Sequence, residues 1–398
     1  MMTTTCSRRK FLGAMGAAAG AYLAHPVMPL ARAVPAGRVA VGTCREYGPE
    51  VTATLARMFD QLGGLEGLVG GKTVAIKLNL TGDATDRLEY LPAEITHWVH
   101  PQVIGATVQL LGQAGAARIR LLESPMSTSE PLEEFMLQAN WEPRDFLGAA
   151  PRVEFENTNY LGYGRKYSRF WVPGGGLMFK GYDLNHSYED CDVFVSLAKL
   201  KEHVTAGVTL SMKNCFGITP CTIYGDGSPV DEPSPAPLGG RGPFHEGNRL
   251  PSKSAPPPLN ALASKDPGYR VPRVVADLVA ARPVHLAVID GIHSMAGGEG
   301  PWCDNVRHVQ PGLLVAGTNC VATDAVCTAL MGFDPMADRG APPFETCDST
   351  LRLAEDVGLG TRDLKRIEVA GAQIKDVVFD FAALRKERRA RMQPARRG

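Results

Sequence analysis

The sequence predicts an α/β fold: an open, mostly parallel sheet with helices on both faces. Short apolar runs that suit buried strands alternate along the chain with longer segments whose apolar residues recur at helical spacing. Polar residues follow most of these runs, as they do at the carboxyl ends of parallel strands. The 398 residues are 44% apolar and 21% charged, which is typical of a globular protein with a large core.

The predicted elements begin with a strand, a helix and a second strand. Residues 73–79 (TVAIKLN) form a buried strand, residues 101–114 a helix, and residues 118–123 the next strand. This order is a βαβ unit, which makes its two strands parallel. Further strands are predicted at 192–196, 285–290, 313–316 and 367–369, and further helices at 272–281, 320–331 and 351–357.

Two regions interrupt the alternation of strands and helices. Residues 157–182 are rich in Gly, Tyr and Arg and are predicted to hold a small antiparallel insertion. Residues 220–270 contain eleven Pro and seven Gly, which predicts a long irregular loop. Because this loop directly follows the densest polar motif of the chain, it is interpreted as a lid over a site, with a linker as the alternative.

The first residues predict a twin-arginine (Tat) export signal. An arginine pair in Ser7–Gly13 (SRRKFLG) is followed by a soft apolar stretch and by a small-residue cleavage site at Ala31–Ala33. We expect residues 1–33 to be a signal peptide read by the Tat translocon and residues 34–384 to be a periplasmic or extracytoplasmic α/β domain. The alternative is a basic N-terminus before an amphipathic helix. No later stretch is predicted to span a membrane.

The charge balance argues against a nucleic-acid binder. Lys and Arg together number 42, as do Asp and Glu, whereas nucleic-acid-binding proteins usually carry an excess of basic residues. Residues 385–398 hold seven basic residues and one acid. This basic tail is interpreted as a solvated helix end, with contact to a membrane or a partner as the alternative.

Cysteine spacing gives no signature of a metal cluster. Eight cysteines follow residue 33, an even number that permits disulfides in an oxidising compartment. No Cys-x-x-Cys occurs, so neither a ferredoxin-type cluster nor a zinc ribbon is indicated. Cys215 and Cys221 are candidates for a disulfide, and Cys320 and Cys327 are expected in the core.

Polar side chains at the strand ends predict a shared site. Lys77 ends the first strand, Glu123 the second and Asp290 a later one. Because the carboxyl ends of parallel strands meet at one edge of a sheet, we expect these groups to line one pocket for a small carboxylate or phosphate. The alternative is that short loops are simply polar.

The densest motif is residues 199–217 (KLKEHVTAGVTLSMKNCFG). Its lysines could bind an anionic group such as a phosphate or carboxylate, and its histidine could act as a general acid or base. A desolvated lysine with a lowered pKa could act as a nucleophile or a base. A solvated basic loop is the alternative. The candidate catalytic residues are His203, Lys213, Lys199 and Asp290, and the candidate substrate-binding residues are Lys77, Asn79, Lys201, Asn214, Gly298 and Gly300.

A divalent metal is a second expectation for this edge of the sheet. Its tentative ligands are Glu123, His203, Asp290 and His293. The glycine-rich turn at 297–301 (GGEGP) suits an anion held by backbone N–H groups. The sequence lacks a P-loop ending, a Gly-x-Gly-x-x-Gly opening a helix, a Gly-x-Ser-x-Gly and a His-Glu-x-x-His, which argues against the corresponding nucleotide-binding, hydrolase and zinc-protease classes.

Three further polar residues are interpreted as structural. Asp324 lies on an otherwise apolar predicted helix, where a buried carboxyl needs a partner such as a neighbouring turn. His97 and His100 precede the helix at 101–114 and are interpreted as a capping pair, with the shared cleft as the alternative.

Together these motifs resemble a known family, the domain of unknown function 362. The resemblance covers roughly residues 39–372 and rests on VAIKLN at 74–79, His100-Pro101, AKLKEHVTAGVTLSMKNCFG at 198–217, VIDGI at 288–292, GGEGP at 297–301 and NCVATDAV at 319–326. The resemblance implies that many members of the family are exported or iron–sulfur-associated proteins and that some carry an appended ferredoxin module. This sequence has no such module, its long Pro/Gly segment departs from the pattern, and the family name supplies no reaction.

Three functions remain open from the sequence. The first is an exported enzyme or cofactor-binding protein that acts on a small anionic substrate, with or without a divalent metal. The second is a redox or iron–sulfur protein, and the third is a non-catalytic periplasmic binding module. The second would use Cys191, Cys215, Cys221 and Cys303.

Overall fold

The computed structural model of the protein describes residues 37–125, 128–160, 167–234, 236–237, 239–381 and 383–384. The predicted signal peptide (1–33) and basic tail (385–398) lie outside the described residues. Among the residues that are described, no helix combines the length and apolar character needed to cross a membrane.

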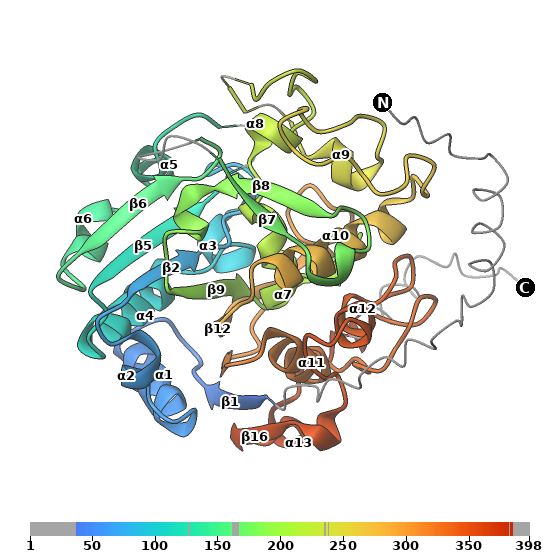
Figure 1. The fold of residues 1–398 in the computed structure, drawn as a ribbon. Coiled ribbons are helices and arrows are strands. Elements are labelled where there is room, and N and C mark those ends of the chain that lie inside the picture. The colour runs from blue at the N-terminus through green and yellow to red at the C-terminus, as the bar shows by residue number, and fades with distance from the viewer. Residues whose placement is uncertain are drawn as a thin grey trace, which may run out of the picture. The chain divides into compact units, whose positions relative to one another are not determined.

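One eight-stranded sheet organises the fold (Figure 1). In spatial order its strands are β16 (Glu368–Gly371), β1 (Arg38–Thr43), β15 (Leu313–Gly317), β12 (Leu286–Gly291), β9 (Val193–Lys199), β2 (Thr73–Lys77), β5 (Arg118–Glu123) and β6 (Val153–Asn157). β15 runs antiparallel to β1 and β12, and all other neighbouring pairs are parallel. The expected open, mostly parallel sheet is thus confirmed.

Helices cover both faces of this sheet. They are α1 (Pro49–Gln61), α2 (Glu66–Val69), α3 (Ala93–Thr96), α4 (Pro101–Gln113), α5 (Leu132–Gln138), α6 (Pro143–Leu147), α7 (Leu210–Asn214), α8 (Cys221–Tyr224), α9 (Gly242–His245), α10 (Pro267–Ala281), α11 (Cys320–Leu330), α12 (Thr350–Asp356) and α13 (Ile374–Val377). Val74 and Ile76 of β2 pack with α1 and α4, whereas Ala75 belongs to the cluster of α10 and α11. Successive strand residues point to opposite faces, so strands covered on both faces are apolar throughout.

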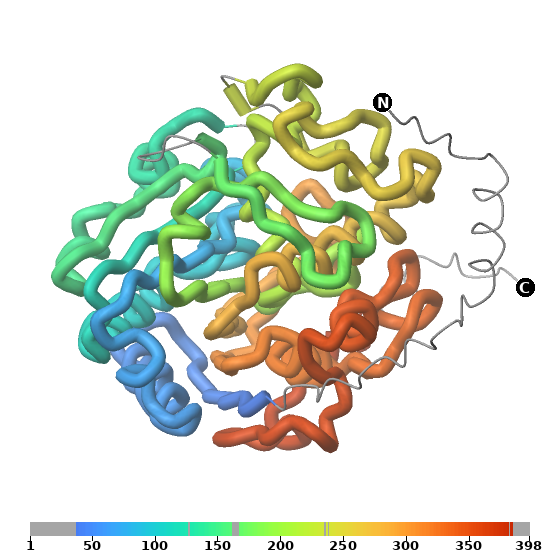
Figure 2. Tube along the Cα trace, viewed as in Figure 1, coloured from blue at the N-terminus to red at the C-terminus, as the bar shows by residue number. Residues whose placement is uncertain are grey.

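Shorter elements decorate the sheet. Two-stranded pairs are formed by β3 (Arg87–Leu88) with β4 (Leu91–Pro92), β7 (Tyr167–Trp171) with β8 (Gly181–Asn185), β10 (Glu202–His203) with β11 (Gly207–Val208), and β13 (Ser294–Ala296) with β14 (Arg307–Val309). The 3₁₀ turns are η1 (Pro173–Gly175), η2 (His186–Tyr188), η3 (Cys215–Ile218) and η4 (Leu364–Arg366). The β7–β8 hairpin largely occupies the predicted antiparallel insertion. Figure 2 shows the 220–270 segment beside this hairpin, where Phe179 pairs with Pro258.

Several elements differ from the sequence prediction. β1, α1 and β6 were not predicted, although α1 buries Val51, Leu55, Met58 and Phe59 at helical spacing. The strand at Leu313–Gly317 runs against the parallel set because only the β13–β14 hairpin and loops, and no crossover helix, separate it from β12.

The order of the strands contains a switch point. After β2 the chain adds β5 and β6 on one side, then returns and places β9 on the other side of β2. In open α/β sheets, ligands bind beyond the carboxyl ends of the strands at such a reversal. A ligand-binding site is therefore expected among the residues that follow β2 and β9.

Candidate functional site

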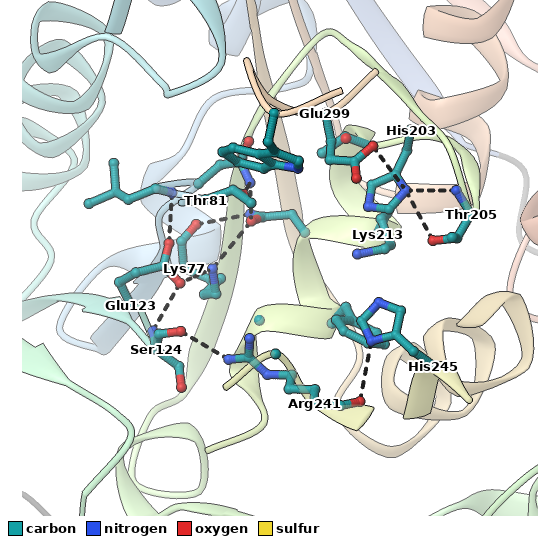
Figure 3. A pocket seen from close by; sticks show the side chains of 18 residues that line it. Lys77, Thr81, Glu123, Ser124, His203, Thr205, Lys213, Arg241, His245 and Glu299 are labelled. Carbon is teal, nitrogen blue, oxygen red and sulfur yellow. Dashed lines mark hydrogen bonds and ion pairs between the residues drawn. The ribbon is translucent and has the colours of Figure 1, made fainter. Parts of the chain in front are cut away.

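A pocket of about 280 Å³ lies at the carboxyl ends of β2 and β5, next to the switch point (Figure 3). Predicted site residues that line it are Lys77, Asn79, Glu123, His203, Lys213 and Asn214. The other lining residues are Leu80, Thr81, Ser124, Thr205, Thr209, Phe216, Gly217, Gly240, Arg241, His245, Glu299 and Trp302. The volume suits a small molecule.

A buried ion pair forms one wall of the pocket. Lys77 Nζ lies 2.5 Å from Glu123 Oε1, and both side chains are almost completely buried. Glu123 also accepts hydrogen bonds from the amides of Leu80 and Ser124, both at 2.9 Å. Burial lowers the pKa of Lys77, and the Glu123 carboxylate opposes that shift. Because its oxygens are already engaged, Glu123 is a structural partner of Lys77 in this arrangement.

Asn214 orients the amide of Asn79 beside this pair. The Asn214 Nδ2 donates to the carbonyl oxygens of Lys77 and Leu197, each at 3.3 Å, which fixes its Oδ1 as an acceptor. That oxygen accepts from Lys77 Nζ at 3.3 Å and from Asn79 Nδ2 at 3.2 Å. Gly217 packs closely against this pair, because a Cβ there would lie 2.9 Å from Lys77 Nζ.

Lys213 projects into the pocket from the short helix α7 (Figure 3). The carboxylate of Asp324 accepts hydrogen bonds from the amides of Ser211 at 2.9 Å and Met212 at 2.8 Å. Leu210, the first residue of α7, has a φ of 44°, a strained value for a branched side chain. The structural interpretation of Asp324 is therefore confirmed: it holds the turn that places Lys213.

The ammonium group of Lys213 is easily deprotonated. Burial is the main cause, and the nearby Arg241 and Lys77 add to it, so that the pKa falls to about 7 despite the opposing carboxylate of Glu299. Nζ also lies 4.1 Å from the centre of the Phe216 ring. Both protonation states of Lys213 are therefore populated near neutral pH.

His203 carries a defined tautomer. Its Nδ1 accepts a hydrogen bond from the amide of Thr205 at 3.2 Å, which leaves the proton of the neutral ring on Nε2. Burial lowers the pKa of His203 well below its usual value. Glu299 Oε2 lies 3.7 Å from the same Nδ1. Burial would raise the pKa of Glu299, but the amide of Val204 and the nearby Lys213 lower it below its usual value.

Arg241 enters the pocket from the 220–270 segment. Its Nε donates to Thr219 and its Nη2 to the carbonyl oxygen of Ser124, all at 2.9 Å. The Asp226 carboxylate accepts from both amides that flank the arginine, those of Gly240 and Gly242. These two hydrogen bonds hold the backbone of Arg241 in the left-handed region, at a φ of 64°. No carboxylate among the described residues lies within ion-pair distance of its guanidinium.

His245 follows on α9 with the opposite tautomer to His203. Its Nδ1 lies 3.2 Å from the carbonyl oxygen of Arg241, which can only accept, so this nitrogen carries the proton. The lone pair is therefore on Nε2. Burial, with Lys213 as the second cause, lowers the pKa of His245 to about 4.

Lys199, Asp290 and His293 lie outside this pocket and form a second cluster. Lys199 Nζ and Asp290 Oδ2 are 3.0 Å apart, and both side chains are fully buried. Asp290 also accepts from the hydroxyl of Tyr47 at 3.0 Å and from the amide of His100 at 3.0 Å. His293 joins this cluster through its amide, which donates to the Tyr47 hydroxyl at 3.4 Å, while its ring bonds to His308 at 2.9 Å. The prediction that these residues share one pocket with His203 and Lys213 is therefore wrong.

The reason for this separation lies in the strand order. Asp290 is on β12, which β9 separates from β2 and β5, and its partners are Tyr47, which follows β1, and His100, which directly precedes α4. His100 caps α4 by accepting from the Gln102 amide, as the sequence predicted. One sheet edge thus holds two separate polar groups.

Three other predicted residues support the pocket without lining it. Lys201 Nζ donates to the carbonyl oxygens of His97 at 2.7 Å and Glu299 at 2.8 Å, which anchors the Glu299 loop. Gly298 and Gly300 are approached by side chains: a Cβ would lie 2.6 Å from the Cβ of Cys303 and 2.2 Å from the Trp302 ring, respectively. Close packing within the loop is the observed reason for these glycines.

The four tentative metal ligands are not brought together. Glu123 and His203 line the pocket, whereas Asp290 and His293 belong to the second cluster. Within the described ranges no group of three or more His, Cys, Asp or Glu side chains is arranged to hold a metal ion. The candidate disulfide between Cys215 and Cys221 is not formed, because both residues carry free thiols.

Sequence reasoning missed Arg241, His245 and the role of Glu299. The available signal was local: a single arginine within Gly239-Gly240-Arg241-Gly242 is an unusual place for a long charged side chain unless the backbone turns sharply there. The contact partners of that arginine, at Thr219 and Ser124, come from distant parts of the chain.

Comparison with known proteins identifies the family. A crystal structure of a structural genomics target from Thermotoga maritima is 16% identical over 45% of this chain and 40% of its own, with a TM-score of 0.27. The comparison with curated proteins gave no match. The family described as "Domain of unknown function (DUF362)" matches residues 74–329. The chain therefore belongs to the DUF362 family.

Proposed function

We propose that the pocket binds a small carboxylate or phosphate compound and that the protein is an enzyme acting on it. The observation that carries this proposal is the buried guanidinium of Arg241, which lines the pocket and has no carboxylate partner among the described residues. An uncompensated buried charge is costly, and a bound anion would remove that cost.

The charges around the pocket favour the same ligand. Lys77 is neutralised by Glu123, and Glu299 lies near His203 and Lys213, which leaves the charge of Arg241 in excess. Hydroxyl and amide groups of Thr81, Thr205 and Asn79 add neutral hydrogen-bonding groups. This pattern suits one anionic group with polar substituents.

The acid–base groups support catalysis rather than binding alone. Lys213 titrates near neutral pH, His203 offers an N–H on Nε2, and His245 offers a lone pair on Nε2. A proton donor and a proton acceptor beside a bound anion suit proton transfer at an atom next to a carboxylate or phosphate.

Ligand binding tests the anion pocket directly. We expect inorganic phosphate or small carboxylates to raise the melting temperature of the full chain and to bind measurably by calorimetry. Arg241→Gln should weaken binding by about tenfold or more, because charged hydrogen bonds contribute about 1.5–3 kcal/mol. Arg249→Gln is the matched control, since Arg249 lies in the same segment but bonds to the Ser228 carbonyl outside the pocket. Equal binding by both variants would contradict the proposal.

The location of the protein is a separate proposal. We propose export by the Tat translocon, supported by the arginine pair and cleavage pattern of residues 1–33. The full chain should reach the periplasm of a bacterial host only when the translocon is functional. The double substitution Arg8→Lys, Arg9→Lys should retain it in the cytoplasm, whereas Lys10→Gln should not. Export of the double variant at the normal level would argue against this route.

A further inference from the structure

Among the described residues, Lys213 differs from the other buried lysines of this region in forming no side-chain hydrogen bond and no ion pair. Lys77, Lys199 and Lys201 each donate to at least two oxygen atoms, from carboxylates, hydroxyls, amides or backbone carbonyls. Within the part of the chain that the structure describes, Lys213 Nζ makes no hydrogen bond and no ion pair. Its Phe216 contact is to a ring face. The amine is therefore free to react with what enters the pocket.

The surroundings of Lys213 favour its neutral form. Arg241 and Lys77 line the same pocket, and both add positive charge near the amine. Glu299 is the acidic group that opposes them. A neutral amine is a nucleophile, whereas an ammonium group is not.

We propose that Lys213 forms a Schiff base with a small carbonyl compound that carries a carboxylate or phosphate group. This inference rests on the proposed function, because it uses Arg241 to hold the anionic group of the same substrate. It narrows the substrate class to compounds such as 2-oxo acids or phosphorylated aldehydes, which have both groups within a few atoms of each other. The pocket volume of about 280 Å³ accommodates such molecules.

The two histidines supply the proton movements that the reaction needs. The amine nitrogen attacks the carbonyl carbon, and a C=N bond finally replaces the C=O bond. Both amine hydrogens leave with the carbonyl oxygen as water, so no oxidant or further reactant is consumed. His245 Nε2, with its lone pair, takes a proton from the nitrogen and returns it to the oxygen. The Nε2–H of His203 polarises the carbonyl group.

Figure 3 supports this division of roles. In that view the Lys213 ammonium lies between the imidazoles of His203 and His245, with Arg241 on the side of the pocket near Ser124. The backbone around Lys213 is held by the Asp324 carboxylate, so the amine is presented from a fixed turn.

Reductive trapping tests the Schiff base. The folded full chain is incubated separately with pyruvate, glyoxylate and glyceraldehyde 3-phosphate, with acetate as the probe that lacks a carbonyl group, and each sample is treated with sodium borohydride. Intact mass and peptide mapping should show one reduced adduct, on Lys213, with at least one carbonyl probe and none with acetate. Lys213→Arg should abolish it, and Lys253→Arg, which changes an exposed lysine, should not.

The outcomes separate this inference from the proposed function. If phosphate or acetate binds at Arg241 but no carbonyl probe labels Lys213, the Schiff base is overturned and the anion pocket stands. Equal labelling of Lys253 and Lys213 also overturns it, because exposed lysines react without a site. If no anion binds and no adduct forms, both proposals fall. Mapping on the unsubstituted protein keeps the test decisive even if Lys213→Arg does not fold.

Discussion

Two groups of buried charges lie at the carboxyl edge of the same sheet, and they differ in how completely their charges are paired. The cluster around Lys199 and Asp290 is closed: both side chains are fully buried, and the carboxylate is saturated by Lys199, Tyr47 and two amides. In the other pocket Lys77 is paired with Glu123, whereas Lys213 and Arg241 form no ion pair with any carboxylate of the described residues. Paired charges stabilise a fold, whereas unpaired charges beside a cavity indicate a ligand.

The largest expected effect is a loss of stability in the closed cluster. Asp290→Ala leaves the Lys199 ammonium buried without its counter-charge, which should lower the free energy of unfolding by about 3–5 kcal/mol. Denaturant unfolding at pH 7 measures it. Asp231→Ala, which breaks the exposed pair with Lys253, is the control and should cost at most about 1 kcal/mol. Similar losses in the two variants would remove the contrast between buried and exposed pairs.

The next effect concerns the turn that presents Lys213. Asp324→Ala leaves the buried amides of Ser211 and Met212 without an acceptor, so stability should fall by about 1–3 kcal/mol. Anion binding should weaken as well, because α7 is no longer held in place. Asp324→Asn retains one acceptor oxygen and should recover part of both properties. A variant that loses stability but binds phosphate normally would show that Asp324 does not position the site.

Lys213→Ala should impair the site without loss of stability, whereas Asp290→Ala is expected to lose stability. Because the Lys213 ammonium has no hydrogen-bond or ion-pair partner among the described residues and its burial is unfavourable, its removal should not lower the free energy of unfolding. Anion binding and any activity should be lost. Circular dichroism and calorimetry on the same sample check the two parts. Substantial unfolding would make Lys213 a structural residue.

The same lysine is expected to make the stability depend on pH. The folded-state pKa of Lys213, about 7, lies below its ordinary value of 10.5, so protonation of this group disfavours the folded state. That penalty is complete below pH 7 and disappears as the pH rises toward 10.5. Lys213→Met should therefore be more stable than the unsubstituted protein at pH 6, with a difference that shrinks above pH 7. Glu299, Arg241, Lys77, His203 and His245 surround the group and are left unchanged in this comparison. A constant difference from pH 6 to pH 10 would contradict the lowered pKa.

Much of the fold was predictable because strands buried on both faces are continuous apolar runs. The strand at Arg118–Glu123 and the helix at Pro101–Gln113 agree with the predicted elements almost to the residue. β1 and β6 were not predicted because their apolar runs are short. β1 is held by pairing with β15 and β16, which are far away in sequence, whereas β6 pairs with β5, the strand before it. The antiparallel direction of β15 follows from a connection without a crossover helix, which apolar patterning does not encode.

By itself, the sequence determined which segments are buried and which polar residues follow β2 and β5, because those properties depend on local periodicity. It placed Lys77, Asn79 and Glu123 at one edge of the sheet. Only the tertiary structure decided which charges meet. The order of the strands places Asp290 beside Lys199 and Tyr47. The hydrogen bonds of Asp226 to the backbone beside Arg241 position that arginine to reach the carbonyl oxygen of Ser124. Whether two charged side chains pair depends on the distance between segments that are remote in sequence, which local patterning does not encode. The candidate pocket is where two cations, Lys213 and Arg241, remain without a carboxylate partner among the described residues.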